Sequence, residues 1–178
     1  DSGSINSSSK ARLKTGLFYI LKRYTLYIMN KLSPEAPVLE PIFIFPSIKN
    51  EMGEIERVAQ HYAPNERGGF IQRFLEKSKV QELEDLKEEV WSNLENTDSY
   101  DIEPNGWSTV EDHISYTNKT SDATRDWQLI KTKMEHGEDL DAPIVLKHGN
   151  IYHLVSGNTR LMVARALGKT PKVLFVEI

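Results

Sequence analysis

The sequence contains no cysteine, and this absence excludes several kinds of chemistry. Without thiols the chain cannot form disulfides, use a thiolate nucleophile or bind zinc through thiolates. It also lacks an apolar run of about eighteen residues, the length that a membrane-spanning helix needs. No uninterrupted apolar signal core followed by a small-residue cleavage site stands near the start. We therefore expect a cytoplasmic protein with no membrane span.

Positive charge is scarce in the middle of the chain. The 178 residues carry a formal net charge of −4 and are 39% hydrophobic, which suffices for one core or for one core with a smaller appendage. Residues 1–33 have a net charge of +5, residues 34–125 of −10 and residues 126–178 of +1. The acidic middle region would repel the phosphate backbone of a nucleic acid, so non-specific nucleic-acid binding over a broad surface is not expected. Any anion site must therefore be local.

The charge and composition divide the chain into three regions. Residues 1–9 are small and polar and predict a flexible leader, and residues 10–31 contain a basic amphipathic helix. That helix could dock onto the domain, form an oligomer with a neighbouring subunit, or contact a membrane surface or an acidic partner. Residues 32–125 form an acidic, mainly helical region, and residues 126–178 a C-terminal unit. The alternative is a single domain over residues 32–178.

Apolar spacing predicts the elements of the acidic region. We expect a strand at 42–45, a helix at 51–62 that stops before Pro64, and a loop at 65–69. Val80, Leu83, Leu86, Val90 and Leu94 fall at helical spacing and predict a longer helix with an acidic outer face. Residues 96–125 are rich in turn formers and predict a long loop.

The C-terminal unit has the clearest pattern. A helix over about 126–136, capped by Asp122 or Thr124, should end at Gly137. The segments PIVLK and IYHLV flank a turn at Gly149–Asn150 and predict a hairpin. The expected register places Ile144 opposite Val155, Leu146 opposite His153 and Lys147 opposite Tyr152. A helix at 159–167, closed by Gly168, and a final strand follow. These elements predict an α+β fold with a small mixed sheet.

Between the second hairpin strand and the last helix lies the turn SGNTR, which comprises Ser156, Gly157, Asn158, Thr159 and Arg160. Gly157 suits a positive φ, and Asn158 or Ser156 suits capping. The free amides of a helix N-terminus attract anions, and an arginine guanidinium can bind phosphate through two donors. The turn therefore predicts a phosphate site, with helix capping alone as the alternative. Neither a P-loop nor a dinucleotide fingerprint is present.

The segment 142–178, APIVLKHGNIYHLVSGNTRLMVARALGKTPKVLFVEI, resembles the ParB/sulfiredoxin-like superfamily. The order and spacing of strand, Gly157, Arg160, Gly168, Pro171 and strand agree, and with the preceding helix the resemblance covers residues 126–178. Members include a DNA-partition CTPase, an ATP-dependent sulfinic acid reductase and small-molecule kinases. The resemblance implies that Gly157, Asn158, Thr159 and Arg160 bind nucleotide phosphates, with ATP or CTP and magnesium as the ligands.

The chain differs from known members of the superfamily in two ways, and each difference excludes or disfavours one of their activities. Sulfiredoxins need a cysteine, which this chain lacks, so their reductase chemistry is excluded. Partition proteins have a glutamate where this chain has Asn158, so chromosome partition by their usual mechanism is not expected. The SGNTR version resembles that of small proteins from bacteriophages or mobile elements.

Other candidate residues carry weaker signals. Asp126 opens the helix before the hairpin and could be a catalytic base or a magnesium ligand, although an acidic residue at a helix N-terminus is expected anyway. The five histidines show no metal-ligand spacing, so no metal centre is predicted from them. A cluster of acidic residues near the hairpin could hold magnesium beside a phosphate or could simply be solvated: Glu135, Glu138, Asp139 and Asp141.

Three hypotheses for the function follow. The first is a nucleotide-binding or phosphate-binding protein, which as an enzyme would perform phosphoryl transfer or hydrolysis with Arg160 and backbone amides stabilising charge. The second is a DNA-binding module that uses the same turn for a DNA phosphate. The third is a non-enzymatic interaction protein, for example a phage protein that targets a host factor in the host cytoplasm.

Overall fold

The computed structural model describes residues 40–121 and 124–178, which belong to one compact unit, Leu39–Ile178. The predicted leader and basic helix within residues 1–31 lie outside the described residues, and so does the oligomer contact expected from that helix. No helix in the described ranges is both long and apolar enough to cross a membrane.

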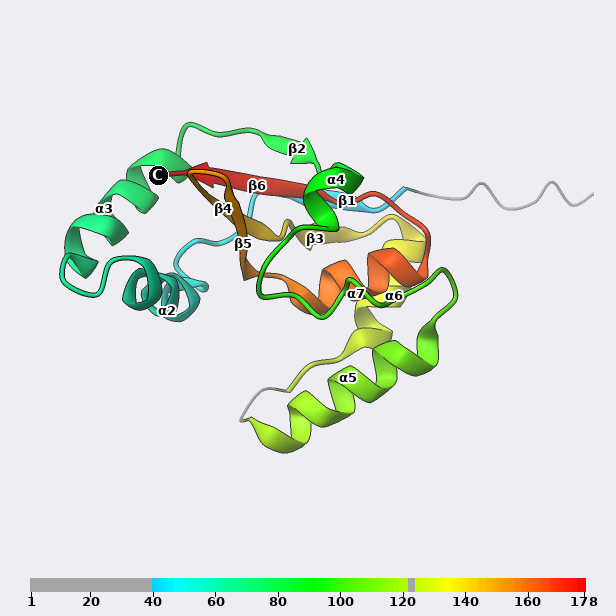
Figure 1. Cartoon of the computed structure of the whole chain (residues 1–178). Helices are drawn as coiled ribbons and strands as arrows, with labels where there is room; N and C mark the ends of the chain where they lie inside the picture. The colour runs from blue at the N-terminus through cyan, green and yellow to red at the C-terminus, as the bar shows by residue number, and fades with distance from the viewer. Residues whose placement is uncertain (1–39, 122–123) are drawn as a thin grey trace, which may run out of the picture. The chain divides into compact units, whose positions relative to one another are not determined.

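The described chain has an α+β fold, as predicted (Figure 1). A four-stranded sheet has the order β2-β6-β4-β5, in which β4 and β6 are parallel and the other pairs are antiparallel. A second sheet pairs β1 with β3 in parallel. In chain order the elements are β1 (Ile42–Ile44), α2 (Met52–Tyr62), α3 (Arg67–Ser78), β2 (Leu83–Asp85), α4 (Glu88–Trp91), α5 (Trp107–Thr120), α6 (Trp127–His136), β3 (Asp139–Asp141), β4 (Ile144–His148), β5 (Ile151–Ser156), α7 (Asn158–Ala166) and β6 (Lys172–Glu177).

Helices cover both faces of the larger sheet. Side chains alternate between the faces of a strand, so each strand supplies two cores. Leu146, Val155 and Leu174 pack with the buried residues of α2 and α3, whereas Val145, Leu154 and Val173 pack with those of α5, α6 and α7. Figure 1 shows α2 and α3 grouped apart from α5, α6 and α7. Because α7 has core on nearly all sides, its N-terminus is held rigidly.

The predicted hairpin is confirmed, with one correction to its register. Leu146 pairs with His153 and Lys147 with Tyr152, and Gly149 has the positive φ of 60° that the tight turn needs. Ile144 pairs with Ser156 rather than with Val155, because the register shifts between Ile144 and Val145. An extra residue of this kind in one strand is a β-bulge. The final strand β6 joins the sheet beside β4, as expected.

The predicted helix over 80–94 is wrong. This segment forms the strand β2 and the single-turn helix α4. Leu83 pairs with Leu174 of β6, and the amide of Leu86 donates to the carbonyl of Pro171 at 2.9 Å. Lys87 then has an extended backbone, with φ −66° and ψ 145°. Pairing with a distant strand therefore overrides the local helical spacing.

Three smaller predictions also need correction. The supposed loop 96–125 contains the helix α5, which buries Val110 and Ile114 on one face. The loop at 65–69 is shorter than predicted, because α3 begins at Arg67. The cap of α6 is Asp126 rather than Asp122 or Thr124, and its side chain accepts the amide of Leu129 at 2.9 Å. The predicted end at Gly137 is confirmed by a left-handed φ of 65°.

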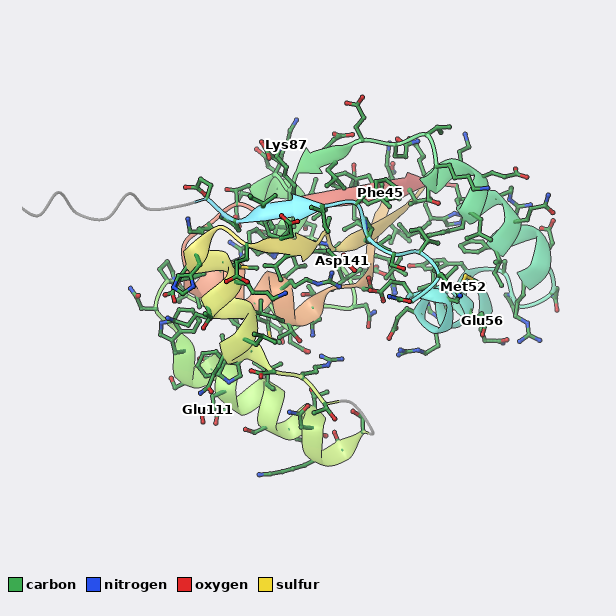
Figure 2. The ribbon with its side chains drawn as sticks, turned by 180° about the vertical axis from the view of Figure 1, so that it is seen from behind. Phe45, Met52, Glu56, Lys87, Glu111 and Asp141 are labelled. Carbon is green, nitrogen blue, oxygen red and sulfur yellow. The ribbon has the colours of Figure 1, made fainter. Side chains whose placement is uncertain are left out.

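The smaller sheet, β1 with β3, brings Asp141 close to the start of α7. Figure 2 shows β1 next to β3, with Phe45 just beyond the end of β1 and Asp141 at the end of β3. Phe43 and Leu140 are paired in this sheet and belong to the core with α7. The carbonyl of Asp141 is thereby placed near the start of α7, where it contacts Arg160.

Candidate functional site

The β5–α7 turn forms one side of a cavity of about 700 Å³. The other sides come from α2, from the loop after α4, and from the end of α5 with the start of α6. The cavity brings together all five residues of the predicted phosphate turn and Asp126. The lining residues are Glu51, Glu54, Arg57, Asn96, Thr97, Asp98, Thr117, Thr124, Arg125, Asp126, Leu129, Ile130, Leu154, Val155, Ser156, Gly157, Asn158, Thr159 and Arg160.

Gly157 is required at the turn for two independent reasons. Its φ of 103° lies in the left-handed region that side chains disfavour. A Cβ atom at this position would lie 2.7 Å from Cβ of Pro143 and 2.8 Å from its Cα. The chain therefore turns tightly against Pro143 before α7 begins.

The N-terminus of α7 faces this cavity without a side-chain cap. Gly157 occupies the N-cap position and has no side chain that could accept the first amides. The amide of Leu161 donates to the carbonyl of Gly157, while the amides before it have no partner within the helix. Together with the positive end of the helix dipole, these donors favour an anion.

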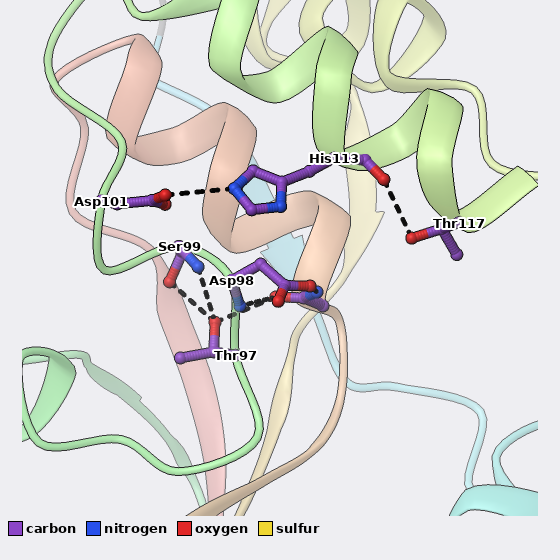
Figure 3. A network of polar contacts seen from close by, with 7 residues as sticks. Thr97, Asp98, Ser99, Asp101, His113 and Thr117 are labelled. Carbon is purple, nitrogen blue, oxygen red and sulfur yellow. Dashed lines mark hydrogen bonds and ion pairs between the residues drawn. The ribbon is translucent and has the colours of Figure 1, made fainter.

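Asn158 has a structural task that the sequence does not reveal. Its Oδ1 accepts from the hydroxyl of Thr97 at 2.9 Å and from the amide of Asp98 at 3.0 Å, and its Nδ2 donates to Oδ2 of Asp98 at 2.7 Å. The Thr97 hydroxyl lies 2.8 Å from that of Ser99, which accepts from Nε1 of Trp91. Figure 3 shows Thr97, Asp98 and Ser99 in this network. The side chain of Asn158 is thus engaged in holding a loop.

Arg160 already has acidic and carbonyl partners. Its Nη1 donates to the carbonyl of Asp141, and its Nη2 lies 3.5 Å from Oε1 of Glu51. The two side chains are 14% and 19% exposed. Burial lowers the pKa of Arg160 from its usual value, and the nearby Glu51 and Asp141 partly offset this. A ligand phosphate would share the guanidinium with Glu51 or displace it.

Arg160 and Arg165 face different ways, as their spacing predicts. Arg165 donates through Nη1 and Nη2 to the two carboxylate oxygens of Glu88, at 2.7 and 2.9 Å. Its guanidinium also lies 3.9 Å from the ring centroid of Trp91, in cation–π geometry. Arg165 therefore anchors α4 to α7 and does not belong to the cavity.

Ser156 supplies the strongest sign of an unmet interaction in the cavity lining. Its residue is only 8% exposed, and its hydroxyl oxygen is buried without a hydrogen-bond partner among the described residues. A buried hydroxyl of this kind costs free energy unless a water or ligand satisfies it.

Charges of both signs line the cavity. Arg57 pairs with Glu54, and the carboxylate of Asp126 is engaged as the cap of α6. The acidic cluster near the hairpin does not contribute to the lining. In that cluster, Glu135 pairs with Lys131 and Glu138 lies near His136. Within residues 40–121 and 124–178, no three His, Asp or Glu side chains are placed to hold a metal ion.

The other walls of the cavity carry no functional motif in the sequence. Glu51, Glu54 and Arg57 belong to a predicted helix that carried no functional signal. Asn96, Thr97 and Asp98 lie about sixty residues before Asn158. Asn96 has a left-handed φ of 59°, a conformation that asparagine adopts more readily than most residues, so its residue type is a weak local signal of a turn in this loop.

Comparisons with protein-family models, with curated proteins and with solved structures found no match for this chain. The resemblance of residues 126–178 to the ParB/sulfiredoxin-like superfamily therefore stays a prediction from the sequence.

Proposed function

We propose that the cavity at the N-terminus of α7 binds the phosphate groups of a nucleotide or a related phosphorylated ligand. The observation that carries this proposal is the uncapped helix N-terminus, set at a tight glycine turn inside a cavity of about 700 Å³. Arg57, Arg125 and Arg160 also line the cavity and offer guanidinium donors to phosphate oxygens. The buried, unpartnered hydroxyl of Ser156 supports a ligand at the same place.

In this proposal magnesium would bind together with the ligand phosphates and not at a separate protein site. In nucleotide sites magnesium is commonly held by one or two carboxylates together with the phosphates, rather than by a cage of protein ligands. Asp98 and Glu54 line the cavity and could supply such carboxylates. When bound, the ion would neutralise phosphate charge. As an enzyme, the chain would use the α7 amides and Arg160 to stabilise charge on a transferred phosphoryl group.

The DNA-binding hypothesis has less support. A DNA backbone would extend beyond the cavity over the acidic region of residues 34–125, whose net charge of −10 would repel it. No observation on the described residues favours the third hypothesis, an interaction protein that targets a host factor. Residence in the cytoplasm, or in the host cytoplasm for a phage protein, is part of the proposal because nucleotides are abundant there.

Calorimetric titration with ATP, CTP and GTP, with and without magnesium, tests the proposal. We expect binding in the wild type, a loss of roughly tenfold or more in Arg160→Ala because a charge-assisted contact disappears, and tighter binding in Glu51→Gln because a competing carboxylate is removed. Arg165→Ala is the matched control and should bind as the wild type does. Absence of binding to every nucleotide would overturn the proposal, and salt-sensitive binding to DNA instead would favour the second hypothesis.

A further inference from the structure

The strand β1 carries apolar side chains on its solvent side. Ile42, Ile44 and Phe45 are 50%, 39% and 46% exposed, so three of the eight exposed large hydrophobic residues of the described chain lie within four positions. Phe43, between the two isoleucines, is buried and packs with Leu140 in the core. Because successive side chains of a strand point to opposite faces, Ile42 and Ile44 lie on the outer face of the β1–β3 sheet.

One edge of β1 pairs with β3, and its other edge is unpaired. The amide of Ala142 donates to the carbonyl of Ile44 at 2.9 Å, so the backbone groups of Ile44 face β3. The groups of Phe43 then face the opposite edge, because backbone groups alternate along a strand. At that edge β1 has no partner strand and no backbone hydrogen bond within residues 40–121 and 124–178. An edge of this kind is a template for another strand.

The hydrogen-bonding groups at this edge match those of an identical copy. In an antiparallel pair centred on Phe43, its amide and carbonyl would bond to the carbonyl and amide of Phe43 in the second copy. The amide of Phe45 would donate to the carbonyl of Pro41 at each end. Pro41 only has to accept there, so its missing N–H does not prevent the contact. Beyond these bonds, Pro41 and Pro46 limit the pairing to this short segment.

The side chains also suit a second copy. Ile42 of one copy would lie opposite Ile44 of the other, and Glu40 would lie opposite the uncharged Pro46. On the outer face of the sheet, Ile42 and Ile44 pair with Asp139 and Asp141 of β3, so β1 is apolar and β3 is acidic. Joining two copies through β1 places the isoleucines at the centre. The two acidic strands are then three strand spacings apart, about 14 Å, where salt screens most of their repulsion.

We propose that β1 is a self-association edge, at which two copies of the chain pair antiparallel about a two-fold axis and form a four-stranded sheet in the order β3-β1-β1-β3. Four residues per strand give a small interface, and interfaces below about 1,200 Å² are typical of weak, transient association. We therefore expect a reversible dimer with a Kd of roughly 10 to 100 µM. The proposal does not depend on the function of the cavity.

Sedimentation equilibrium of the full chain, from well below to well above that Kd, tests the association. Ile44→Lys should raise the Kd roughly tenfold or more, because a charged side chain on an edge strand opposes pairing. Val80→Lys is the matched control, because Val80 is 74% exposed and lies outside β1, and it should associate as the wild type does. A wild type that stays monomeric at every concentration would overturn the proposal. So would an Ile44→Lys variant that dimerises as tightly as the wild type.

Single cysteines test the register, because the chain has no cysteine of its own. Residue 42 of one copy and residue 44 of the other would have Cβ atoms about 4.5 Å apart, within reach of a disulfide, whereas two residues 42 are diagonal neighbours. A mixture of Ile42→Cys and Ile44→Cys chains should therefore cross-link several-fold faster under mild oxidation than either variant alone. Val80→Cys gives the background rate. Equal rates for the mixture and the separate variants would refute the antiparallel pairing.

Discussion

Three residues of the SGNTR turn have distinct structural roles. Gly157 permits the left-handed backbone and the close approach to Pro143, and Asn158 holds the loop that contains Thr97 and Asp98. Arg160 joins the carbonyl of Asp141 to Glu51. The buried hydroxyl of Ser156 has no partner among the described residues. A ligand in the cavity would thus meet the amides at the start of α7 and an arginine that is shared with a carboxylate.

Replacing Gly157 by alanine tests the close approach to Pro143. We expect Gly157→Ala to destabilise the fold by about 2 to 4 kcal/mol, because left-handed strain and steric overlap add together. Gly149→Ala is the matched control: Gly149 also has a positive φ, but a Cβ atom there would meet no other atom within 4 Å, so only about 1 kcal/mol of strain is expected. Urea unfolding of both variants measures the difference, and equal losses would contradict this explanation.

The contact between Asn158 and Asp98 can be tested by exchanging the two side chains. Asn158→Asp places two carboxylates where a 2.7 Å hydrogen bond now stands, and we expect it to cost about 2 kcal/mol or more. Adding Asp98→Asn restores a donor facing an acceptor, while Oδ1 at position 158 can still accept from Thr97. Urea unfolding should show recovery of most of the lost stability. If the double variant is no more stable than Asn158→Asp, the hydrogen bond does not hold the loop.

At the scale of elements, the start of α6 combines a structural role with a candidate catalytic role. Asp126 accepts the amide of Leu129 and also lines the cavity. Because asparagine caps helices about as well as aspartate, the two roles can be separated by substitution.

Asp126→Asn should leave the free energy of unfolding within a few tenths of a kcal/mol, whereas Asp126→Ala should lower it by about 1 kcal/mol because the cap is lost. Thermal or urea unfolding provides the measurement. Phosphate release or transfer from a nucleotide, measured on the same variants, reports on the second role. Loss of that activity in Asp126→Asn would show that Asp126 acts as a base or as a magnesium ligand. Full activity would show that Asp126 serves only as the cap of α6.

The segment 80–94 shows where element prediction failed. Leu83, Leu86, Val90 and Leu94 have helical spacing, yet Leu83 belongs to a strand and Val90 to a single-turn helix. A short strand at the edge of a sheet is stabilised by pairing with its partner strand, here β6. In contrast, the hairpin and α7 were predictable, because a tight turn and an apolar helix with glycines at both ends are local signals.

At the scale of the whole described unit, the two helical layers meet the sheet through polar contacts at its edge as well as through the cores. Tyr62 is the clearest example, because it joins α2 to Glu95 and His153. Its pKa is raised from 10.0 to about 12, first by burial and then by Glu95. The folded state therefore binds the phenolic proton more tightly than the unfolded state does.

This difference predicts an alkaline loss of stability. The contribution of Tyr62 is fully present below pH 10 and is lost as the pH rises towards 12, because the unfolded chain releases the proton first. Urea midpoints at pH 9 and pH 11 should therefore fall less in Tyr62→Phe than in the wild type. Tyr116→Phe, at a tyrosine that is 70% exposed, should fall as the wild type does. If the urea midpoint falls by the same amount between pH 9 and pH 11 in all three proteins, the raised pKa of Tyr62 does not contribute to stability.

The sequence by itself determined the α+β class, the hairpin turn, the buried helix α7 and the glycine turn before it. All of these depend on spacing and on turn residues within a few positions of one another. Only the tertiary structure decided that Asn158 holds Thr97 and Asp98, that Arg160 meets Glu51, and that Tyr62 meets His153. These contacts join residues that are sixty or more positions apart, and their partners are chosen by the packing of helices on a shared sheet, which no local pattern specifies.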